Sequence, residues 1–559
     1  MPISSANILQ HMAVPHRHDV YQIGCLEHRV TLYSQQVRAL NLVFALFDLK
    51  KLERSSRVVV VGAGAAGLTA TVALARHGAT VTLLERLDAV IPFQSGNLTR
   101  WLHPHIYEWP AEGCLNPNSG LPLLNWSADS AANVAISLRD EFYQHVRQSK
   151  TIQLQKGVRN VRLHTGPKGQ RLEWNNAGGG FHSERFDVVI LAVGFGLEGS
   201  SLFPVQSYWR NDDLAQFELD ADRVRHYLVS GCGDGGLVDL LRLRLRDFQH
   251  NQMLEELVGS IPDRPRMERQ LLLAEEEARA KVERGEDPSE FLYDEYQRIR
   301  PRSIDEKVAS RLRGDTRATL NGPGAFPWNL GSSILNRFLA SALIGLEHPG
   351  AGHAVGADWW RGRIAHIDQE GGGYRVRLEN EEARSFDRVI LRHGPRPTIS
   401  QWWMQRTDEA QLRSRNALDQ TRLPAWPEGF FGQLAKPTKR PWKRVRNIRV
   451  HVPAQAGRPA SEFVIEVPSL CRFDDLTNTI YFMLEPQPPA FTYGQTWRLR
   501  NRASGLDIVH ERERAEAPGF GVYTPDSRSV EDAGILPGDD LEVVFLSDFP
   551  LTGDEANHL

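Results

Sequence analysis

The chain of 559 residues is too long for one ordinary hydrophobic core and predicts two to four domains. Its formal net charge of -3 at pH 7 excludes a strongly basic protein, so neither nucleic acid nor an anionic membrane is an expected partner. The four cysteines lie far apart and form neither a CxxC pair nor a zinc-like cluster. We therefore expect no disulfide framework, no metal site and a cytoplasmic location.

The N-terminal residues show no basic region followed by an apolar core, so we expect no secretory signal. The longest apolar run, 58–75, contains glycines in a phosphate-loop pattern. That pattern predicts a strand, a loop and a helix, and it argues against a membrane span.

The chain begins with an expected helical extension, 1–54, in which residues 34–49 carry apolar side chains at helical spacing. From residue 57 the pattern becomes a strand (RVVVV), a glycine turn (GAGAAG), a helix (LTATVALARHG) and a strand (VTLLER). Such nearly continuous apolar strands are typical of a parallel sheet. Downstream we expect a helix over 131–147 and a strand, FDVVILAVG, over 186–194.

A second strand–glycine–helix unit, HYLVSGCGDGGLVDLLRLRLRDF, spans 226–248. A long charged helical stretch follows to about residue 313, and further strands are expected at 317–320 and 386–394. The last of these, FDRVILRHG, echoes FDVVILAVG and indicates an internal repeat.

The composition of the sequence changes after about residue 430, where proline and aromatic residues become more frequent and helical periodicity fades. We expect strands at 463–467, 479–484 and 541–546, separated by turns. Residues 431–559 are therefore predicted to form a separate, mainly β domain.

The first glycine turn has the spacing GxGxxG, with Gly62, Gly64 and Gly67 between a strand and a helix. The first glycine permits a tight turn, the second lets a pyrophosphate approach the backbone, and the third lets the helix pack on the strand. The helix N-terminus then presents N–H groups and a positive dipole end to the phosphates. Glu85 ends the next strand, where its carboxylate is placed to bind a ribose hydroxyl.

The stretches VVVVGAGAAGLTATVALARHG, VTLLER and FDVVILAVGFG resemble FAD-dependent oxidoreductases with two dinucleotide-binding domains, such as flavin-containing monooxygenases and pyridine-nucleotide reductases. The resemblance covers roughly residues 57–400. It implies FAD at the first glycine turn, because glutamate-arginine at the end of the second strand is typical of the FAD version. The implied FAD-binding residues are Gly62, Ala63, Gly64, Ala65, Ala66, Gly67, Glu85, Arg86, Arg100 and Gly194.

The resemblance also implies an α/β fold, in which a Rossmann-like FAD domain contains an inserted second Rossmann-like domain with a helical insertion. A C-terminal, mainly β domain completes the chain. The expected domains are 1–54, a helical extension; 55–220, FAD-binding; 221–395, NAD(P)-binding-like with its insertion at about 237–315; 396–430, a return to the FAD domain or a linker; and 431–559, β-rich.

The second glycine turn, GCGDGG, places Gly231, Gly233, Asp234 and Gly236 where the resembled families bind NAD(P)H, so we expect a nicotinamide nucleotide there. Two features depart from those families. A long helical stretch precedes the next strand, and Asn321-Gly322 at that strand's end offers neither an acid for an NAD ribose nor an arginine for an NADP phosphate. The alternative is a nucleotide fold that has lost its ligand or forms a partner interface.

Residues 97–110, NLTRWLHPHIYEWP, follow the first unit, where the chain passes the flavin in related proteins. Arg100 and two histidines bring charge and exchangeable protons to this stretch, and its aromatic rings are suited to stacking on a flavin. We take His103 and His105 as the candidate catalytic residues. The alternative is a structural loop with core aromatics, and the lone His393 is likewise expected to be structural.

The run KPTKRPWKRVRNIR, 436–449, has seven basic residues and no acid. A solvated linker or domain seam is the favoured interpretation, because the chain as a whole is slightly acidic. Contact with nucleic acid or an acidic partner is the alternative.

Together these features predict an FAD-dependent enzyme that is reduced by NAD(P)H and acts on an unidentified small-molecule substrate. Monooxygenase-like chemistry is favoured because the sequence has no redox cysteine pair. The rival hypothesis is an FAD-binding sensor or assembly component without turnover, whose helical insertion or C-terminal domain binds a protein partner. An adenylating enzyme with one Rossmann site is disfavoured by Glu85 and by the strand FDVVILAVG.

Overall fold

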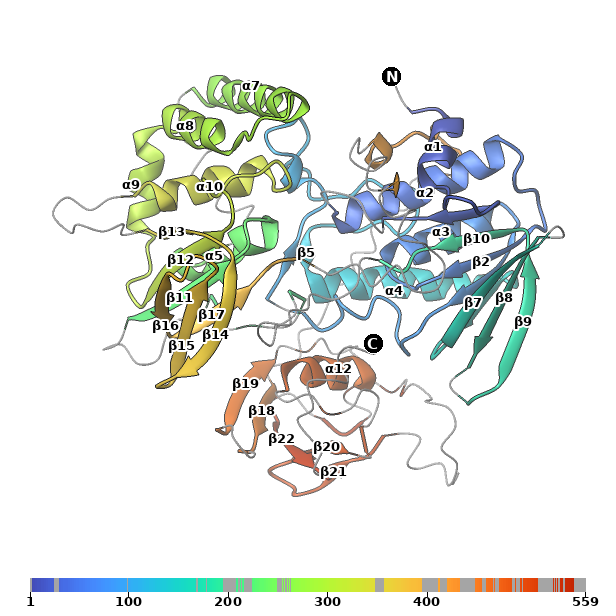
Figure 1. Ribbon diagram of the computed structural model, residues 1–559. Coiled ribbons are helices and arrows are strands. Elements are labelled where there is room, and N and C mark those ends of the chain that lie inside the picture. The colour runs from blue at the N-terminus through green and yellow to red at the C-terminus, as the bar shows by residue number, and fades with distance from the viewer. Residues whose placement is uncertain are drawn as a thin grey trace.

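A computed structural model describes most of residues 3–546. The longer stretches outside the description are 25–29, 195–207, 216–223, 249–253, 347–355, 395–410, 413–419, 433–447 and 511–525, with shorter gaps elsewhere. Of the predicted basic run, only residues 448 and 449 are described. The described chain forms two α/β lobes side by side, with a smaller third body against them (Figure 1).

The first lobe is built on a five-stranded parallel sheet with helices on its faces (Figure 1). In spatial order its strands are β1 (Val20–Gln22), β10 (Val188–Leu191), β2 (Arg57–Val61), β3 (Thr80–Leu84) and β6 (Ile152–Gln155). The helices are α1 (Ser5–Met12), α2 (Leu32–Asp48), α3 (Ala65–Arg76) and α4 (Ala131–Gln148). An antiparallel meander adds β7 (Arg159–Gly166), β8 (Gly169–Asn175) and β9 (Phe181–Phe186). Strand β1 was not predicted, and it joins the N-terminal segment to the sheet.

The second lobe repeats this plan. Its parallel sheet has the order β13 (Asp358–Arg361), β12 (Thr316–Gly322), β11 (Arg225–Ser230) and β17 (Arg388–Leu391). Helices α5 (Asp234–Arg244) and α10 (Ile334–Ile344) connect it, and its meander is β14 (Ile364–Glu370), β15 (Gly373–Leu378) and β16 (Ala383–Phe386). Strand β17 lies beside β11 as β10 lies beside β2. The echo between the two FDxVILxxG stretches is therefore a structural repeat.

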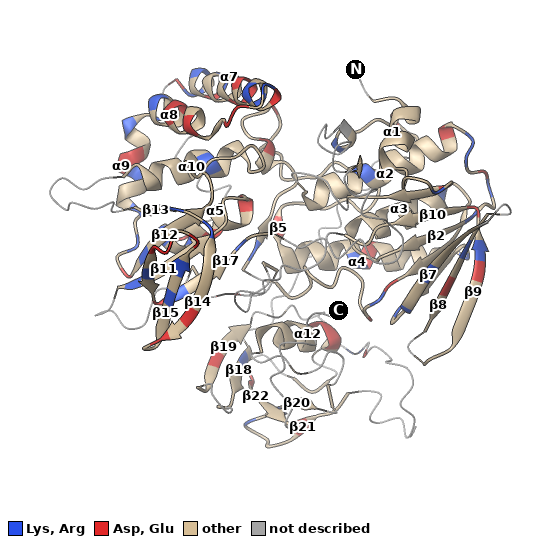
Figure 2. Cartoon of the chain, in the orientation of Figure 1, with Lys and Arg blue, Asp and Glu red and all other residues tan. Residues whose placement is uncertain are grey.

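Between α5 and β12 the described residues of the second lobe include the inserted helices α7 (Arg264–Glu283), α8 (Ser289–Ile299) and α9 (Arg302–Ser310). They cap the lobe beyond α10 (Figure 1). Their outer surfaces carry charges of both signs (Figure 2), whereas the inner side of α7 buries Glu275 in an ion pair with Arg337 of α10. The insertion is thus anchored to the domain core through a buried charge pair.

The third body is a mixed five-stranded sheet packed on one helix, α12 (Phe473–Met483). Its strand order is β19 (Ser461–Ile465), β18 (Ile448–Val452), β22 (Asp540–Phe545), β20 (Trp497–Asn501) and β21 (Asp507–Ile508). A first hairpin, then the helix, then a last strand parallel to the first is the β-grasp arrangement.

The predicted strand at 479–484 is wrong, because most of this stretch lies in α12. Threonine, isoleucine, tyrosine and phenylalanine favour strands by local propensity. The apolar residues Phe473, Leu476 and Ile480 nevertheless recur at helical spacing and are buried against the sheet. Tertiary burial therefore decided the conformation.

Helix α12 also packs against the first lobe. Arg139 of α4 pairs with Asp475 of α12, and a Cβ added to Gly96 would lie only 2.9 Å from Cβ of Thr479. The backbone N–H of Ile91, in the same segment as Gly96, donates to the Ala63 carbonyl at 2.9 Å. The C-terminal domain therefore supports the chain beside the first glycine turn.

A buried charge network joins the two α/β lobes. Asp239, in α5 of the second lobe, receives hydrogen bonds from Arg100 of the first lobe and from Arg392, the latter at 2.8 Å. Asp212 pairs with Arg100 at 2.9 Å and with Arg242 at 2.7 Å. Burial alone would raise the pKa of Asp239, but Arg100 and Arg392 hold this pKa well below its ordinary value. Asp239 is thus ionised and holds the lobes together.

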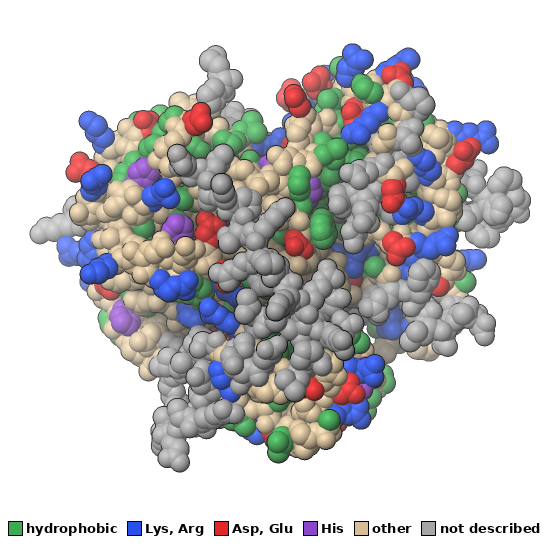
Figure 3. Space-filling model, turned by 180° about the vertical axis from the view of Figure 1, so that it is seen from behind, with side chains coloured by type: hydrophobic (Ala, Val, Ile, Leu, Met, Phe, Trp, Pro, Cys, Tyr) green, Lys and Arg blue, Asp and Glu red, His purple; other side chains and the backbone are tan. Residues whose placement is uncertain are grey.

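On the face that Figure 3 shows, charged side chains of both signs are interspersed, and the described residues form no broad patch of one charge there. Among the described residues, no helix is both long enough and apolar enough to cross a bilayer.

We expect Asp239→Ala to lower the free energy of unfolding by about 3–5 kcal/mol, because it leaves buried arginines without their acid. Urea denaturation followed by tryptophan fluorescence measures this loss. Asp263→Ala is the matched control: its ion pair with Arg266 is exposed and contributes little. Equal midpoints for Asp239→Ala and wild type would contradict a coupling role for this carboxylate.

Candidate functional site

The first glycine turn has two glycines that the fold requires and one that it does not. Gly62 has a φ of 103°, and a Cβ there would overlap the Ala192 carbonyl. A Cβ on Gly67 would overlap the Gly62 carbonyl oxygen. Gly64 has an ordinary extended backbone, and a Cβ there would meet no described atom within 4 Å. Because no described residue demands glycine at this position, the space at Gly64 fits a ligand that approaches the backbone.

Helix α3 begins directly after Gly64, which is its N-cap residue. The first turn of any helix leaves its amide N–H groups without intrahelical partners, and here these groups belong to Ala65, Ala66 and Gly67. The first turn contains no acidic residue that would neutralise the positive end of the helix dipole. Open backbone space and donor groups at a helix N-terminus together suit a pyrophosphate.

Glu85 lies at the end of β3, beside this turn, and is only 8% exposed. One carboxylate oxygen accepts a hydrogen bond from the Ala63 N–H at 2.6 Å, and the other accepts from the Leu87 N–H at 2.8 Å. Burial raises the pKa of Glu85, while these two hydrogen bonds oppose the rise. A carboxylate has about four acceptor positions, so backbone hydrogen bonds leave room for a ribose hydroxyl. Its geometry fits the role predicted for it.

The other predicted FAD-binding residues lie at the edge of this site. Arg86 is exposed next to Glu85. Gly194 follows β10 with a φ of 69°, and no described atom lies within 4 Å of where its Cβ would be. Both positions remain candidates for contact with the cofactor.

Arg100 has a different role from the predicted one. It is 2% exposed, its Nε donates to the Tyr208 carbonyl at 2.9 Å, and its other two nitrogens pair with Asp212 and Asp239. The guanidinium also lies 4.0 Å from the centroid of the Tyr208 ring. With all three nitrogens engaged, Arg100 is a residue of the lobe interface, and we withdraw it as an FAD ligand.

The two candidate catalytic histidines also have structural partners. Nδ1 of His103 accepts hydrogen bonds from the N–H groups of His105 and Ile106, at 3.2 and 3.1 Å. Nε2 of His105 lies 3.1 Å from the Asn118 carbonyl oxygen, and burial lowers the pKa of His105. These contacts give both side chains a role in shaping the loop, which was the alternative interpretation of this stretch.

The segment that carries these histidines enters the core of the second lobe. Ile106 and Trp109 are buried among residues of α5, α7 and α10, and Nε1 of Trp109 donates to Glu268 of α7 at 3.0 Å. The sequence pattern did not reveal this, because aromatic residues serve flavin stacking and core packing equally well. The helical insertion supplies packing partners for these aromatic side chains and thereby decides in favour of core packing over flavin stacking.

The second glycine turn repeats the geometry of the first. Gly231 has a φ of 127°, and a Cβ there would overlap the Arg392 carbonyl. A Cβ on Gly236 would overlap the Gly231 carbonyl oxygen, whereas at Gly233 it would meet nothing in the described chain within 4 Å. Gly233 is exposed and is the N-cap residue of α5. This turn therefore keeps the backbone opening that a phosphate requires.

Asp234 departs from the first site, where alanine occupies this position. One of its carboxylate oxygens accepts from the Ser333 N–H at 2.8 Å, from the Ser333 hydroxyl at 2.9 Å and from the Asn336 amide at 2.7 Å. Ser333 is the N-cap residue of α10. Asp234 therefore ties the N-terminus of α10 to that of α5 and is a positioning residue of the second turn.

The residues that end β12 lack a group for a ribose. Asn321 is buried, accepts from the Ser230 hydroxyl at 2.7 Å and donates to the Trp360 carbonyl at 2.8 Å. Nε2 of His393 lies 2.8 Å from the same Ser230 oxygen, which gives this histidine a structural contact. The polar side chains at this edge of the sheet therefore form hydrogen bonds with one another and with the backbone.

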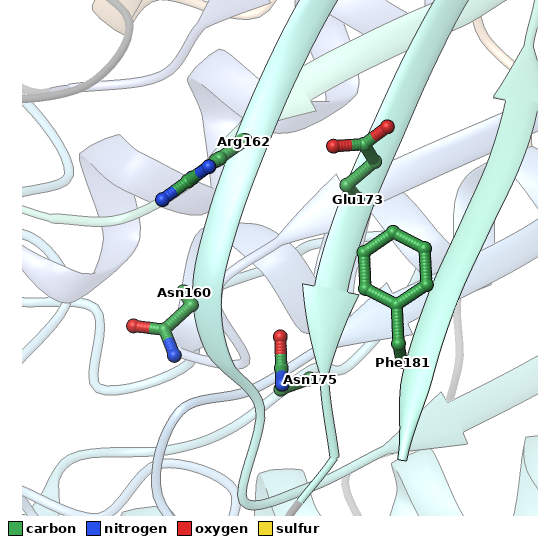
Figure 4. A pocket seen from close by; sticks show the side chains of 5 residues that line it. All are labelled: Asn160, Arg162, Glu173, Asn175 and Phe181. Carbon is green, nitrogen blue, oxygen red and sulfur yellow. The ribbon is translucent and has the colours of Figure 1, made fainter. Parts of the chain in front are cut away.

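A surface hollow of about 350 Å³ lies on the outer meander of the first lobe (Figure 4). It is lined by Asn160, Arg162, Glu173, Asn175 and Phe181. None of these residues belongs to either glycine turn, so the hollow is separate from both nucleotide sites.

One comparison with known proteins concerns the segment that contains the first glycine turn. Residues 57–158 match the family model described as FAD dependent oxidoreductase. This part of the chain is similar to that family. This segment contains β2, the first glycine turn, α3 and Glu85, which are the elements whose geometry fits the cofactor. No curated protein sequence matches the chain.

Solved structures with a similar fold include three reductases. Thioredoxin reductase from T. acidophilum is 14% identical over 61% of this chain and 78% of its own, with a TM-score of 0.30. Bacillithiol disulfide reductase from Staphylococcus aureus is 10% identical over 62% and 78%, with a TM-score of 0.33. The NAD-dependent persulfide reductase from A. fulgidus is 12% identical over 64% and 47%, with a TM-score of 0.30. With TM-scores this low, we rest no functional conclusion on them.

We expect Gly64→Val to lose FAD while the protein stays folded, because the new side chain enters only the space of the pyrophosphate. Gly67→Val is the matched contrast, since its side chain overlaps the Gly62 carbonyl and should unfold the domain. The measurements are flavin content by absorbance after purification and thermal unfolding of both variants. Full flavin occupancy in folded Gly64→Val would place the cofactor elsewhere.

We expect Glu85→Ala to weaken FAD binding by about 1–3 kcal/mol, the usual loss for a charged hydrogen-bond acceptor. This corresponds to roughly five- to 150-fold in affinity. Titration of the apoprotein with FAD, followed by flavin fluorescence, measures the change. Exposed Glu382→Ala serves as the control, and an unchanged affinity for Glu85→Ala would remove this residue from the site.

Proposed function

We propose that FAD bound at the first glycine turn is reduced by a nicotinamide nucleotide bound at the second. Bound flavin would supply electrons to oxygen or to a small organic acceptor, and oxygen is favoured because it would support monooxygenase-like chemistry. The cofactors supply the hydride transfer, and the protein supplies binding and orientation. A cytoplasmic location is part of the proposal.

The observation that carries the proposal is the repeated geometry of the two glycine turns. In each turn the outer glycines are required by packing and the middle one opens toward a ligand. The lobes that bear the turns are joined by the buried Asp239 network. Two nucleotide cradles held in one arrangement suit transfer between two bound cofactors.

The cysteine pattern and the two described cysteines support an acceptor other than a disulfide. The sequence has no CxxC pair. Burial raises the pKa of Cys114, and it raises the pKa of Cys232 to about 12. A buried thiol that stays protonated is a poor nucleophile for disulfide exchange. We therefore do not extend the disulfide chemistry named for the similar reductases to this chain.

A second candidate function is a sensor or assembly component in which FAD is structural. The engagement of Arg100, His103 and His105 in structural contacts favours it, because it leaves no acid or base identified for turnover. In this function the helical insertion or the C-terminal domain binds a protein partner. Reduction by a nicotinamide nucleotide distinguishes the two candidates.

We expect the purified protein to be yellow and to contain FAD, and NADH or NADPH to bleach the flavin without oxygen. Gly233→Val should abolish bleaching while leaving FAD bound and the fold intact, because a Cβ there would meet no described atom within 4 Å. Anaerobic stopped-flow absorbance near about 450 nm follows the reaction. If neither nucleotide reduces the wild type, the sensor function replaces the enzyme function.

A further inference from the structure

We propose that the second glycine turn selects NADPH over NADH, and that Arg361 recognises the 2′-phosphate that distinguishes them. This inference rests on the proposed function and deepens it. The sequence at the end of β12 offers neither an acid for an NAD ribose nor an arginine for an NADP phosphate. The tertiary structure supplies the missing charge from the neighbouring strand.

The repeat makes it possible to locate the ribose-binding position in the second lobe. In the first lobe Val61 pairs with Leu84, and Glu85 follows. In the second lobe Ser230 pairs with Asn321, and Gly322 follows. The first residue of each turn also makes the same bond: the Gly62 N–H donates to the Leu84 carbonyl at 2.7 Å, and that of Gly231 to the Asn321 carbonyl at 2.9 Å. Gly322 therefore occupies the position of Glu85.

Glycine at this position changes which ribose the site accepts. A carboxylate there binds the free 2′-hydroxyl of NADH and repels a 2′-phosphate. No such acid can be accommodated without rearrangement, because a Cβ on Gly322 would lie 2.8 Å from Sγ of Cys232 and 3.1 Å from the Trp359 ring. The repulsion that excludes NADPH from NAD-specific sites is thus absent.

Arg361 stands directly across from Gly322, on the last residue of β13. The two strand ends are held together by the Gly362 N–H, which donates to the Gly322 carbonyl at 2.8 Å. Side chains alternate along a strand, so Arg361 projects from the same face as Trp359, whose ring lies against Gly322. Arg361 therefore lies on the face of the sheet from which the ribose would be read.

The charge of Arg361 is available to a ligand. Its side chain is exposed, and it makes no ion pair with any described residue. Asp358, the acid of β13, is three residues away and so projects from the opposite face. The planar, always charged guanidinium matches phosphate oxygens in a bidentate manner. This geometry is that of an adenosine 2′-phosphate site whose arginine comes from β13, the strand next to β12.

The test is calorimetric titration of the FAD-loaded protein with NADP+, NAD+, and the fragments 2′,5′-ADP and 5′-AMP. We expect NADP+ to bind more tightly than NAD+, and 2′,5′-ADP more tightly than 5′-AMP. Arg361→Gln should weaken the two 2′-phosphorylated ligands by about 10- to 100-fold and leave the other two unchanged. Arg317→Gln, an exposed arginine near the other end of β12, is the matched control and should change nothing.

Several results would overturn the inference. If wild type binds NAD+ as tightly as NADP+, or if Arg361→Gln weakens all four ligands equally, Arg361 does not read the 2′-phosphate. The proposed function would still stand in that case, provided that NADH bleaches the flavin. If no nucleotide binds and none bleaches the flavin, the proposed function fails and this inference fails with it.

Discussion

The arrangement of the two α/β lobes depends on one buried carboxylate. Asp239 accepts hydrogen bonds from Arg100 of the first lobe and from Arg392 of the second, in a region closed to solvent. Ionised groups in such a place are tolerated only when they are paired and hydrogen-bonded, because water no longer compensates their charge. The requirement to pair these charges therefore sets which surfaces of the lobes meet, and through them how the two glycine turns are placed relative to one another.

The two lobes share one plan but have diverged where ligands would bind. Ala192 and Arg392 occupy equivalent places, since the carbonyl of each lies against the first glycine of its turn. In the first lobe this residue is only a packing surface, whereas in the second its side chain enters the charge network. Glu85 and Gly322 likewise occupy equivalent places but differ in side chain. The backbone geometry of the two turns is the same, whereas the residue against the first glycine packs in the first lobe and enters the charge network in the second.

The C-terminal domain also combines paired charges with a contact to another domain. Its sheet carries charges that pair across strands, including Arg449 with Glu462 at 3.1 Å and Arg500 with Asp507 at 2.7 Å. These side chains satisfy one another at the surface. Its helix instead contacts the first lobe through Asp475. The helix of this domain faces the first lobe, and the charge pairs of its sheet face solvent. Through its helix the domain stabilises the segment next to the FAD turn.

The sequence by itself determined the local chemistry: two GxGxxG turns, Glu85 after the first, parallel strands, and the repeat between FDVVILAVG and FDRVILRHG. These features depend on glycine conformation and apolar periodicity over a few neighbouring residues. They can therefore be recognised in the sequence without knowledge of the fold. Only the tertiary structure decided the roles of Arg100, His103 and Trp109, because charged and aromatic side chains suit a cofactor and a buried interface equally well. It also decided that 473–483 is a helix and brought Arg361 beside Gly322. Both results arise from strand register and burial between segments distant in sequence, which no local pattern records.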